Sequence, residues 1–134
     1  MSSYQNRTDL WAIIIHGNVS ASTRKQADVL DIEDLARVKP MISRNKFLQV
    51  LAINGQIINE SNRETVNEMI GSHPSLEHVD LFDNMMSLDT CTFFFNSVSD
   101  LASIKELNLG DNGLDADART HLKELSAGRV SISF

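Results

Sequence analysis

The chain has 134 residues, a length that suits one domain, and its 42% hydrophobic and 22% charged residues form a globular rather than a disordered composition. No stretch approaches the ~18 consecutive apolar residues of a membrane helix, and no basic segment followed by a long apolar run opens the chain. The single cysteine, Cys91, excludes an internal disulfide and fits a reducing compartment. We therefore expect a soluble, cytoplasmic protein that does not enter the membrane.

The net charge of −6 is concentrated in the C-terminal half of the chain. Residues 1–75 carry eight acidic and eight basic side chains, whereas residues 76–134 carry ten acidic and four basic side chains. Binding to a nucleic-acid backbone needs clustered Lys and Arg, which this half lacks. The distribution argues against a nucleic-acid partner and favours another protein with a basic surface.

One apolar pattern recurs along the chain and predicts its strands. The pattern is Leu-x-x-Leu-x-Leu-x-x-Asn-x-Leu, and its copies begin near Leu10, Leu48, Leu76 and Ile104. The last three copies start 28 residues apart, whereas the first step is 38 residues long. A fixed period of this size is typical of a solenoid, so we expect one domain over residues 1–134 with one strand in each repeat.

The first repeat is about ten residues longer than the others. Its extra residues fall within about 19–31, where Ser, Thr, Arg and Lys predict a loop insertion. A helix is expected next, from Asp34 to Arg44, with Pro40 as a kink because proline cannot donate to the helix ladder.

Further helices are expected to follow the second, third and fourth strands. The Ser61 and Glu64 pair has the spacing of a capping box, which predicts a helix start at Ser61. Asp89 and Asp115 are the predicted caps of the next two helices. The inward-facing residues of these helices keep the 28-residue period, as in Val66, Phe94 and Leu122.

The segment Val130–Phe134 alternates apolar and polar residues and predicts a last strand. Only nine residues precede the first strand, and none remain to cap the last one. Solenoids usually close their ends with polar elements, and an open strand edge is a template for pairing. We therefore expect self-association or assembly into a larger complex through uncapped ends.

The repeats resemble those of leucine-rich repeat proteins, and the 28-residue period with a helical second half is similar to the ribonuclease-inhibitor class. The lead-in His73-Pro74-Ser75-Leu76 is similar to the Asn-Pro-Ser-Leu that commonly joins helix to strand in that class. The resemblance implies an α/β fold, a short right-handed β/α solenoid with a parallel sheet on the concave face and helices on the convex face. It also implies that the column Asn18, Gln56, Asn84 and Asn112 is structural. An ordinary α/β domain is the alternative.

Residues that alternate with the motif leucines should point outward onto the concave sheet, because side chains of a strand alternate between its two faces. The rows expected across neighbouring strands are Ala12, Val50, His78 and Glu106; Ile14, Ala52, Asp80 and Asn108; and His16, Asn54, Phe82 and Gly110. An exposed aromatic ringed by polar groups has the composition of an interface anchor, and Phe82 fits it; a lone exposed Phe is the alternative. The predicted protein-binding residues are Ile14, His16, Asn54, His78, Asp80, Phe82, Asp83, Glu106, Asn108 and Asp111.

No sequence motif indicates catalysis, a cofactor or a metal. The glycines are isolated, and no nucleophile motif is present. His78 and Asp80 are expected on a broad open sheet, which is a poor metal site. We therefore predict a non-catalytic protein-protein interaction module, a scaffold or adaptor. The resemblance leaves open a regulator of an actin-type assembly or of a small GTPase, for which Arg24 is the candidate arginine.

Overall fold

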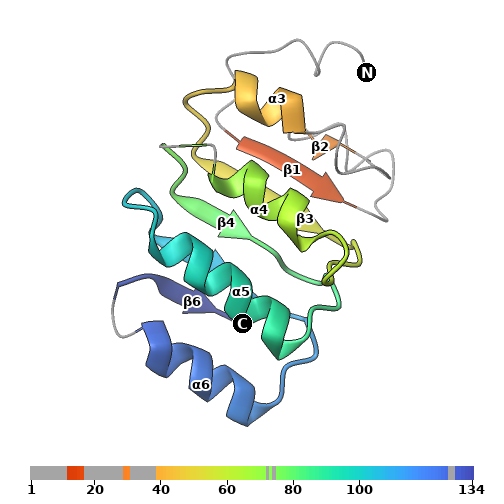
Figure 1. The fold of residues 1–134 in the computed structure, drawn as a ribbon, viewed down its shortest axis with the longest axis vertical. Coiled ribbons are helices and arrows are strands. Elements are labelled where there is room, and N and C mark those ends of the chain that lie inside the picture. Colours follow the sequence, from red (N-terminus) through yellow and green to blue (C-terminus); the bar gives the residue numbers. More distant parts are fainter. Residues whose placement is uncertain (1–11, 17–28, 31–38, 72, 74, 127–128) are drawn as a thin grey trace.

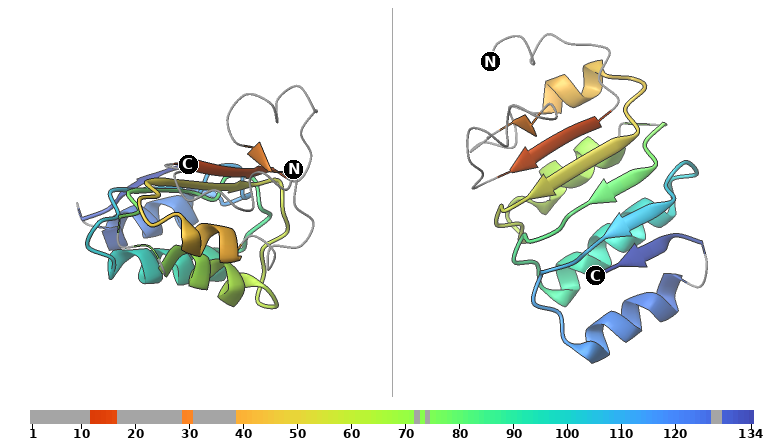
Figure 2. Two further views of the ribbon diagram at one scale, coloured as in Figure 1. Left: turned by 90° about the horizontal axis from the view of Figure 1, so that it is seen from above. Right: turned by 180° about the vertical axis from the view of Figure 1, so that it is seen from behind.

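The computed structural model describes residues 12–16, 29–30, 39–71, 73, 75–126 and 129–134. Strands and helices alternate along the chain and pack as two layers, with the sheet on one side and the helices on the other (Figures 1 and 2). The strands are β1 Ala12–His16, β2 Val29–Leu30, β3 Val50–Asn54, β4 His78–Asp80, β5 Glu106–Asn108 and β6 Ser131–Ser133. The helices are α3 Lys39–Arg44, α4 Arg63–Gly71, α5 Leu88–Ser99 and α6 Ala116–Ser126. This arrangement confirms the predicted fold class, a short β/α leucine-rich-repeat solenoid.

All strands of the sheet run parallel, in the order β2-β1-β3-β4-β5-β6. In this sheet Val50 pairs with His78, and His78 pairs with Glu106, so partners on neighbouring strands lie one 28-residue repeat apart. The core-facing residues follow the same register, because Leu51 pairs with Val79. The sequence pattern therefore sets which residues of neighbouring strands lie side by side.

The expectation of a loop over residues 19–31 is wrong at Val29 and Leu30. These two residues form β2 and pair in parallel with Ile14 and Ile15 of β1. Both are apolar and suited to a strand, and they end a polar segment whose other residues, 19–28 and 31, lie outside the described part of the chain. β1 is consequently covered along part of the edge that was expected to be open. At the other side of the sheet, β6 pairs only with β5 among the described strands.

The motif residues fill a single core between the sheet and the helices. Nine of them, three from each 28-residue repeat, are at most 5% exposed: Leu48, Leu51, Ile53, Leu76, Val79, Leu81, Ile104, Leu107 and Leu109. Each following helix adds one fully buried residue at the same place in the repeat, namely Val66, Phe94 and Leu122. Each repeat thus packs against the next one with equivalent side chains.

The helix starts differ from the prediction in two of three cases. Helix α4 begins at Arg63 rather than Ser61, because the Asn62 carbonyl accepts the first helical bonds, from the N–H groups of residues 65 and 66. Helix α5 begins at Leu88, and its N-cap is Ser87, which accepts from the N–H of residue 90. Asp115 caps α6 as predicted, since its Oδ1 accepts from the N–H of residue 118 at 2.8 Å.

Pro40 lies in the described part of α3, Lys39–Arg44, so the predicted helix is present there. The predicted kink stays a prediction, because the residues that precede Lys39 are not described. The remainder of the predicted helix, residues 34–38, lies outside the described residues.

Candidate protein-binding surfaces

The sheet face consists of the outward side chains of the strands and of the residues that directly continue β4 and β5. The strand pairing aligns the predicted rows, since Ile14 pairs with Ala52, and His16 pairs with Asn54. On this face Phe82 and Glu106 are exposed, and the half-buried predicted residues are Asn54, His78, Asp80 and Asn108. Ala52 is buried, so its place in the row adds little contact surface. The side chains of Ile14 and His16 are outside what the structure describes.

Phe82 lies directly over Gly110, its neighbour in the third row. A Cβ atom added to Gly110 would lie 3.0 Å from the Phe82 Cδ2 atom and 2.9 Å from the carbonyl carbon of Phe134. Glycine is needed here because two groups approach the backbone closely. The Phe82 ring is thus seated against the sheet while its side chain stays 37% exposed.

Asp80 and Asn108 occupy equivalent positions at the ends of β4 and β5. The Asp80 Oδ1 atom accepts a hydrogen bond of 2.9 Å from the N–H of Phe82. The Asn108 Oδ1 atom accepts an identical bond of 2.9 Å from the N–H of Gly110. Short polar side chains that bond the backbone two residues on stabilise a turn. Both residues therefore have a structural role at the strand ends.

Glu106 has an ionisable neighbour on the sheet face. Its Oε2 atom lies 3.0 Å from the Nδ1 atom of His78 on the adjacent strand, and the two side chains are 61% and 41% exposed respectively. A cation from a partner that approaches Glu106 would therefore compete with the His78 ring. Within the described ranges no group of three His, Cys, Asp or Glu residues is placed to hold a metal ion.

Asp83 and Asp111 follow the strands at a position with a left-handed backbone. Their φ angles are 60° and 53°, and Gly55, one repeat earlier, has a φ of 71°. The Gly55 N–H donates to the Asp83 carbonyl, and the Asp83 N–H donates to the Gly110 carbonyl, both at 2.9 Å. Gly and Asp tolerate this conformation better than most residues. Both aspartates are also exposed, so their carboxylates border the sheet face.

Two members of the asparagine column, Asn84 and Asn112, have the structural role that the resemblance implied. Asn84 donates from Nδ2 to the Ile53 carbonyl at 2.6 Å and accepts at Oδ1 from the N–H of Gln56 at 3.0 Å. Asn112 repeats the donor bond to the Leu81 carbonyl at 3.0 Å and accepts at Oδ1 from the N–H of Asn84 at 2.8 Å. Each side chain therefore ties its own repeat to the preceding one. The first member of the column lies outside the described residues.

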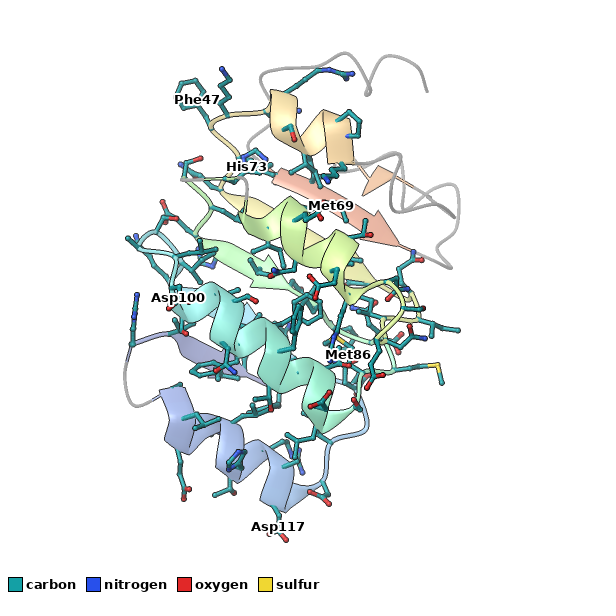
Figure 3. The ribbon with its side chains drawn as sticks, viewed as in Figure 1. Phe47, Met69, His73, Met86, Asp100 and Asp117 are labelled. Atoms are coloured by element: carbon teal, nitrogen blue, oxygen red, sulfur yellow. The ribbon has the colours of Figure 1, made fainter. Side chains whose placement is uncertain are left out.

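A second exposed region, which the strand pattern does not predict, lies where the loops after the strands lead into the helices. Ile57, Met85 and Leu88 are exposed there, with Met85 at 72%. An open hollow of about 560 Å³ adjoins Met85 and Leu88, and its lining also includes Leu114, Asp115, Asp117 and His121. We call these side chains and the hollow the loop surface. In Figure 3 Met86 lies toward the right and Asp117 at the bottom, whereas Phe47 and Asp100 lie on the left. The sequence feature that could have indicated this surface is the 28-residue spacing of two apolar residues, Ile57 and Met85, after the strands.

Two buried titratable groups lie away from both surfaces. Burial raises the pKa of the Cys91 thiol to about 12, so this cysteine is a buried apolar residue rather than a nucleophile. Burial also lowers the pKa of His73 from its ordinary 6.5, an effect that the nearby Ile42 carbonyl opposes in part. The candidate GTPase-directed residue, Arg24, lies outside the described residues. In the part of the chain that is described, no helix is long and apolar enough to cross a membrane.

Comparison with known proteins gives one structural relationship. Neither the protein-family models nor the curated protein sequences contain a match to this chain. Among solved structures, the tropomodulin C-terminal domain of Caenorhabditis elegans is similar, with a TM-score of 0.63 and 18% sequence identity. The similarity covers 99% of this chain and 80% of that domain. At this identity the two chains share a fold, and the likeness supports the leucine-rich-repeat architecture.

Proposed function

We propose that this chain is a non-catalytic protein-interaction module, a scaffold or adaptor that binds the basic surface of a partner protein through its sheet face. The observation that carries the proposal is the seating of Phe82 against Gly110, which leaves the ring 37% exposed beside the exposed carboxylates of Asp83 and Asp111.

The seated ring suits the role of an interface anchor. An exposed aromatic that moves freely must be ordered on binding, which costs roughly 0.5–1.5 kcal/mol for a side chain with many rotamers. Part of this cost is already removed for Phe82, because its ring lies against Gly110. Aromatic anchors surrounded by polar groups contribute most of the affinity in many interfaces.

The charges on and beside the sheet face favour a basic partner. Its described strand and loop positions carry Asp80, Asp83, Glu106 and Asp111, and the rows that contain them have no Lys or Arg. Asp83 and Asp111 are the freest of the four, because Asp80 bonds its own turn and His78 lies beside Glu106. We expect these two residues to steer association most strongly.

Binding kinetics of single variants test the proposal after affinity capture has identified a partner. In surface-plasmon measurements Phe82→Ala should shorten the lifetime of the complex and cost about 2 kcal/mol or more, because anchors act mainly on dissociation. Asp83→Asn should lower the association rate and its salt dependence, at a cost under about 1 kcal/mol. Glu124→Gln, an exposed change on helix α6, is the matched control and should bind like the parent.

Parent-like binding of Phe82→Ala and Asp83→Asn would contradict the assignment. If a change at Phe93, on the helical side, then abolished binding, the helices would be the working surface.

The two alternative functions that the family resemblance leaves open can be tested with the same purified protein. Co-sedimentation with actin filaments tests an actin-type partner, and GTP hydrolysis by a panel of small GTPases tests the regulatory alternative. Stimulated hydrolysis that is lost in Arg24→Ala would replace the present proposal. Sedimentation of the chain alone at high concentration tests self-association through the β6 edge.

A further inference from the structure

Met85 is exposed and held in an unfavourable backbone conformation at the same time. Its φ angle is 53°, in the left-handed region, and its side chain is 72% exposed. The equivalent residue of the next repeat is Gly113, which adopts a φ of 75° without the steric cost of a Cβ atom. A methionine here therefore has both an exposed apolar side chain and a strained backbone. Such combinations persist mostly where the side chain has a function.

The surroundings of Met85 have the shape of a binding surface. Met85 lines the hollow of about 560 Å³ on the side of α6. It also lines a second open hollow of about 470 Å³, on the side of α4, together with Ile58, Glu60 and Thr90. Ile57, on the loop before α4, and Leu88, the first residue of α5, are also exposed. The methionine thus stands between two depressions, each of which has room for a side chain of another molecule.

The charges of these loops define the chemistry of the occupant. The three segments 55–62, 83–88 and 111–118 contain five acidic residues, Glu60, Asp83, Asp111, Asp115 and Asp117, and no Lys or Arg. Two arginines directly follow these segments. Arg63 forms an ion pair with Asp89 at 3.0 Å and lies over the Phe93 ring, and Arg119 is exposed on helix α6. A positively charged segment would therefore meet carboxylates without competition from a basic residue of these loops.

We propose that the loop surface is a second interaction site, which binds a short segment of a partner protein in which an apolar side chain is flanked by Lys or Arg. The apolar side chain enters the hollow beside Met85, and the basic residues face Glu60 and Asp117. Methionine suits such a surface, because its flexible thioether adapts to apolar groups of different shape. The apolar contact of this site, Met85, is distinct from Phe82, the proposed anchor of the sheet face, whereas Asp83 and Asp111 border both surfaces.

A peptide selection tests the proposal without a known partner. Short random peptides displayed on phage are panned against the full chain, and the enriched peptides are synthesised and titrated by fluorescence anisotropy. The enriched sequences should place Lys or Arg around an apolar residue. Met85→Gly should weaken their binding about tenfold or more, while the variant stays folded because Gly113 already shows that glycine fits this backbone. Asp117→Asn should reduce the salt dependence of binding.

Two controls separate this site from the sheet face and from general charge attraction. Phe82→Ala should bind the peptides like the parent, and so should Asp100→Asn, which changes an exposed carboxylate at the C-terminal end of helix α5, on the left in Figure 3. Absence of enriched peptides, enrichment of peptides without basic residues, or equal binding by Met85→Gly would each overturn the proposal. Loss of binding in Phe82→Ala but not in Met85→Gly would assign the peptides to the sheet face instead.

Discussion

At the scale of single residues, the repeated backbone explains side chains that otherwise look functional. The position shared by Gly55, Asp83 and Asp111 has a left-handed φ in all three repeats. A residue chosen only for its charge could equally be Glu, but Glu tolerates this region less well than Asp. The aspartates beside the sheet face therefore satisfy the backbone and supply a carboxylate together.

Asp111→Val should lower the free energy of unfolding by about 1 kcal/mol or more, because a β-branched residue is strained at this φ. Asp111→Gly should leave the stability unchanged or raise it slightly. Gly55 occupies the equivalent position of an earlier repeat and adopts the same left-handed conformation. Denaturant titrations of the two variants measure both free energies of unfolding. Equal stabilities would show that the left-handed conformation at Asp111 carries no strain for other residues.

His73 should make stability depend on pH near neutrality. Its pKa in the fold is lowered from 6.5, so below about pH 6.5 the unfolded chain binds a proton that the folded chain does not. Stability should therefore fall as the pH drops from about 7 toward 5, by at most about 1.4 kcal/mol per pH unit from this single group. His73→Asn should remove this contribution, and His121→Asn, at an exposed histidine, should not. Thermal melts over this pH range measure both.

At the scale of elements, the asparagine column connects one strand-to-helix turn to the next. The Asn112 side chain accepts from the N–H groups of Asn84 and Met86 and donates to the carbonyls of Leu81, Leu109 and Gly110. Removal of the amide would leave several buried backbone groups without a partner. Such groups cost about 1–3 kcal/mol each.

Asn112→Ala should accordingly destabilise the fold by about 3 kcal/mol or more. Asn96→Ala is the matched control, because Asn96 lies exposed on helix α5, and its substitution should cost under about 0.5 kcal/mol. Urea denaturation followed by far-ultraviolet circular dichroism compares them. A small effect of Asn112→Ala would mean that water replaces the amide and that the column contributes little.

The strands were predictable from sequence because their information is strongly repeated. Leu51, Val79 and Leu107 each occupy the same place in a 28-residue period, and the strand pairing follows that period. The helix starts carry weaker information, because Ser87 and Asp89 are both good caps only two residues apart, and the chain uses Ser87. Val29 and Leu30 were missed since two apolar residues after a polar segment give no recognisable period.

At the scale of the whole molecule, the sequence located one surface and missed the other for a physical reason. Alternation along a strand predicts which residues point outward, and it placed Phe82 and Glu106 on the sheet face. It does not predict contacts between outward residues, such as the His78 and Glu106 pair. Nor does it predict loop shape, so the exposure and strain of Met85 became visible only with the backbone in place.

The stability of the molecule depends on contacts between successive repeats. Strands pack mainly on neighbouring strands, and α4, α5 and α6 pack on one another in order. In such a quasi-one-dimensional array, damage to one repeat also weakens the interfaces on its two sides. A core residue of a central repeat should therefore matter to the entire domain.

Leu81→Ala and Leu109→Ala should each lower the free energy of unfolding by about 2–5 kcal/mol, because both side chains are buried and leave a cavity between sheet and helices. Leu125→Ala, at a leucine that is 44% exposed, should cost under about 1 kcal/mol. Proteins of this size are stable by roughly 5–15 kcal/mol, so each single variant should remain folded, while the double variant should be close to unfolding. Guanidinium melts of the parent and of these four variants measure the differences. Costs below about 1 kcal/mol at both leucines would contradict the assigned register, because substitutions that small in effect are typical of surface positions and not of a packed core.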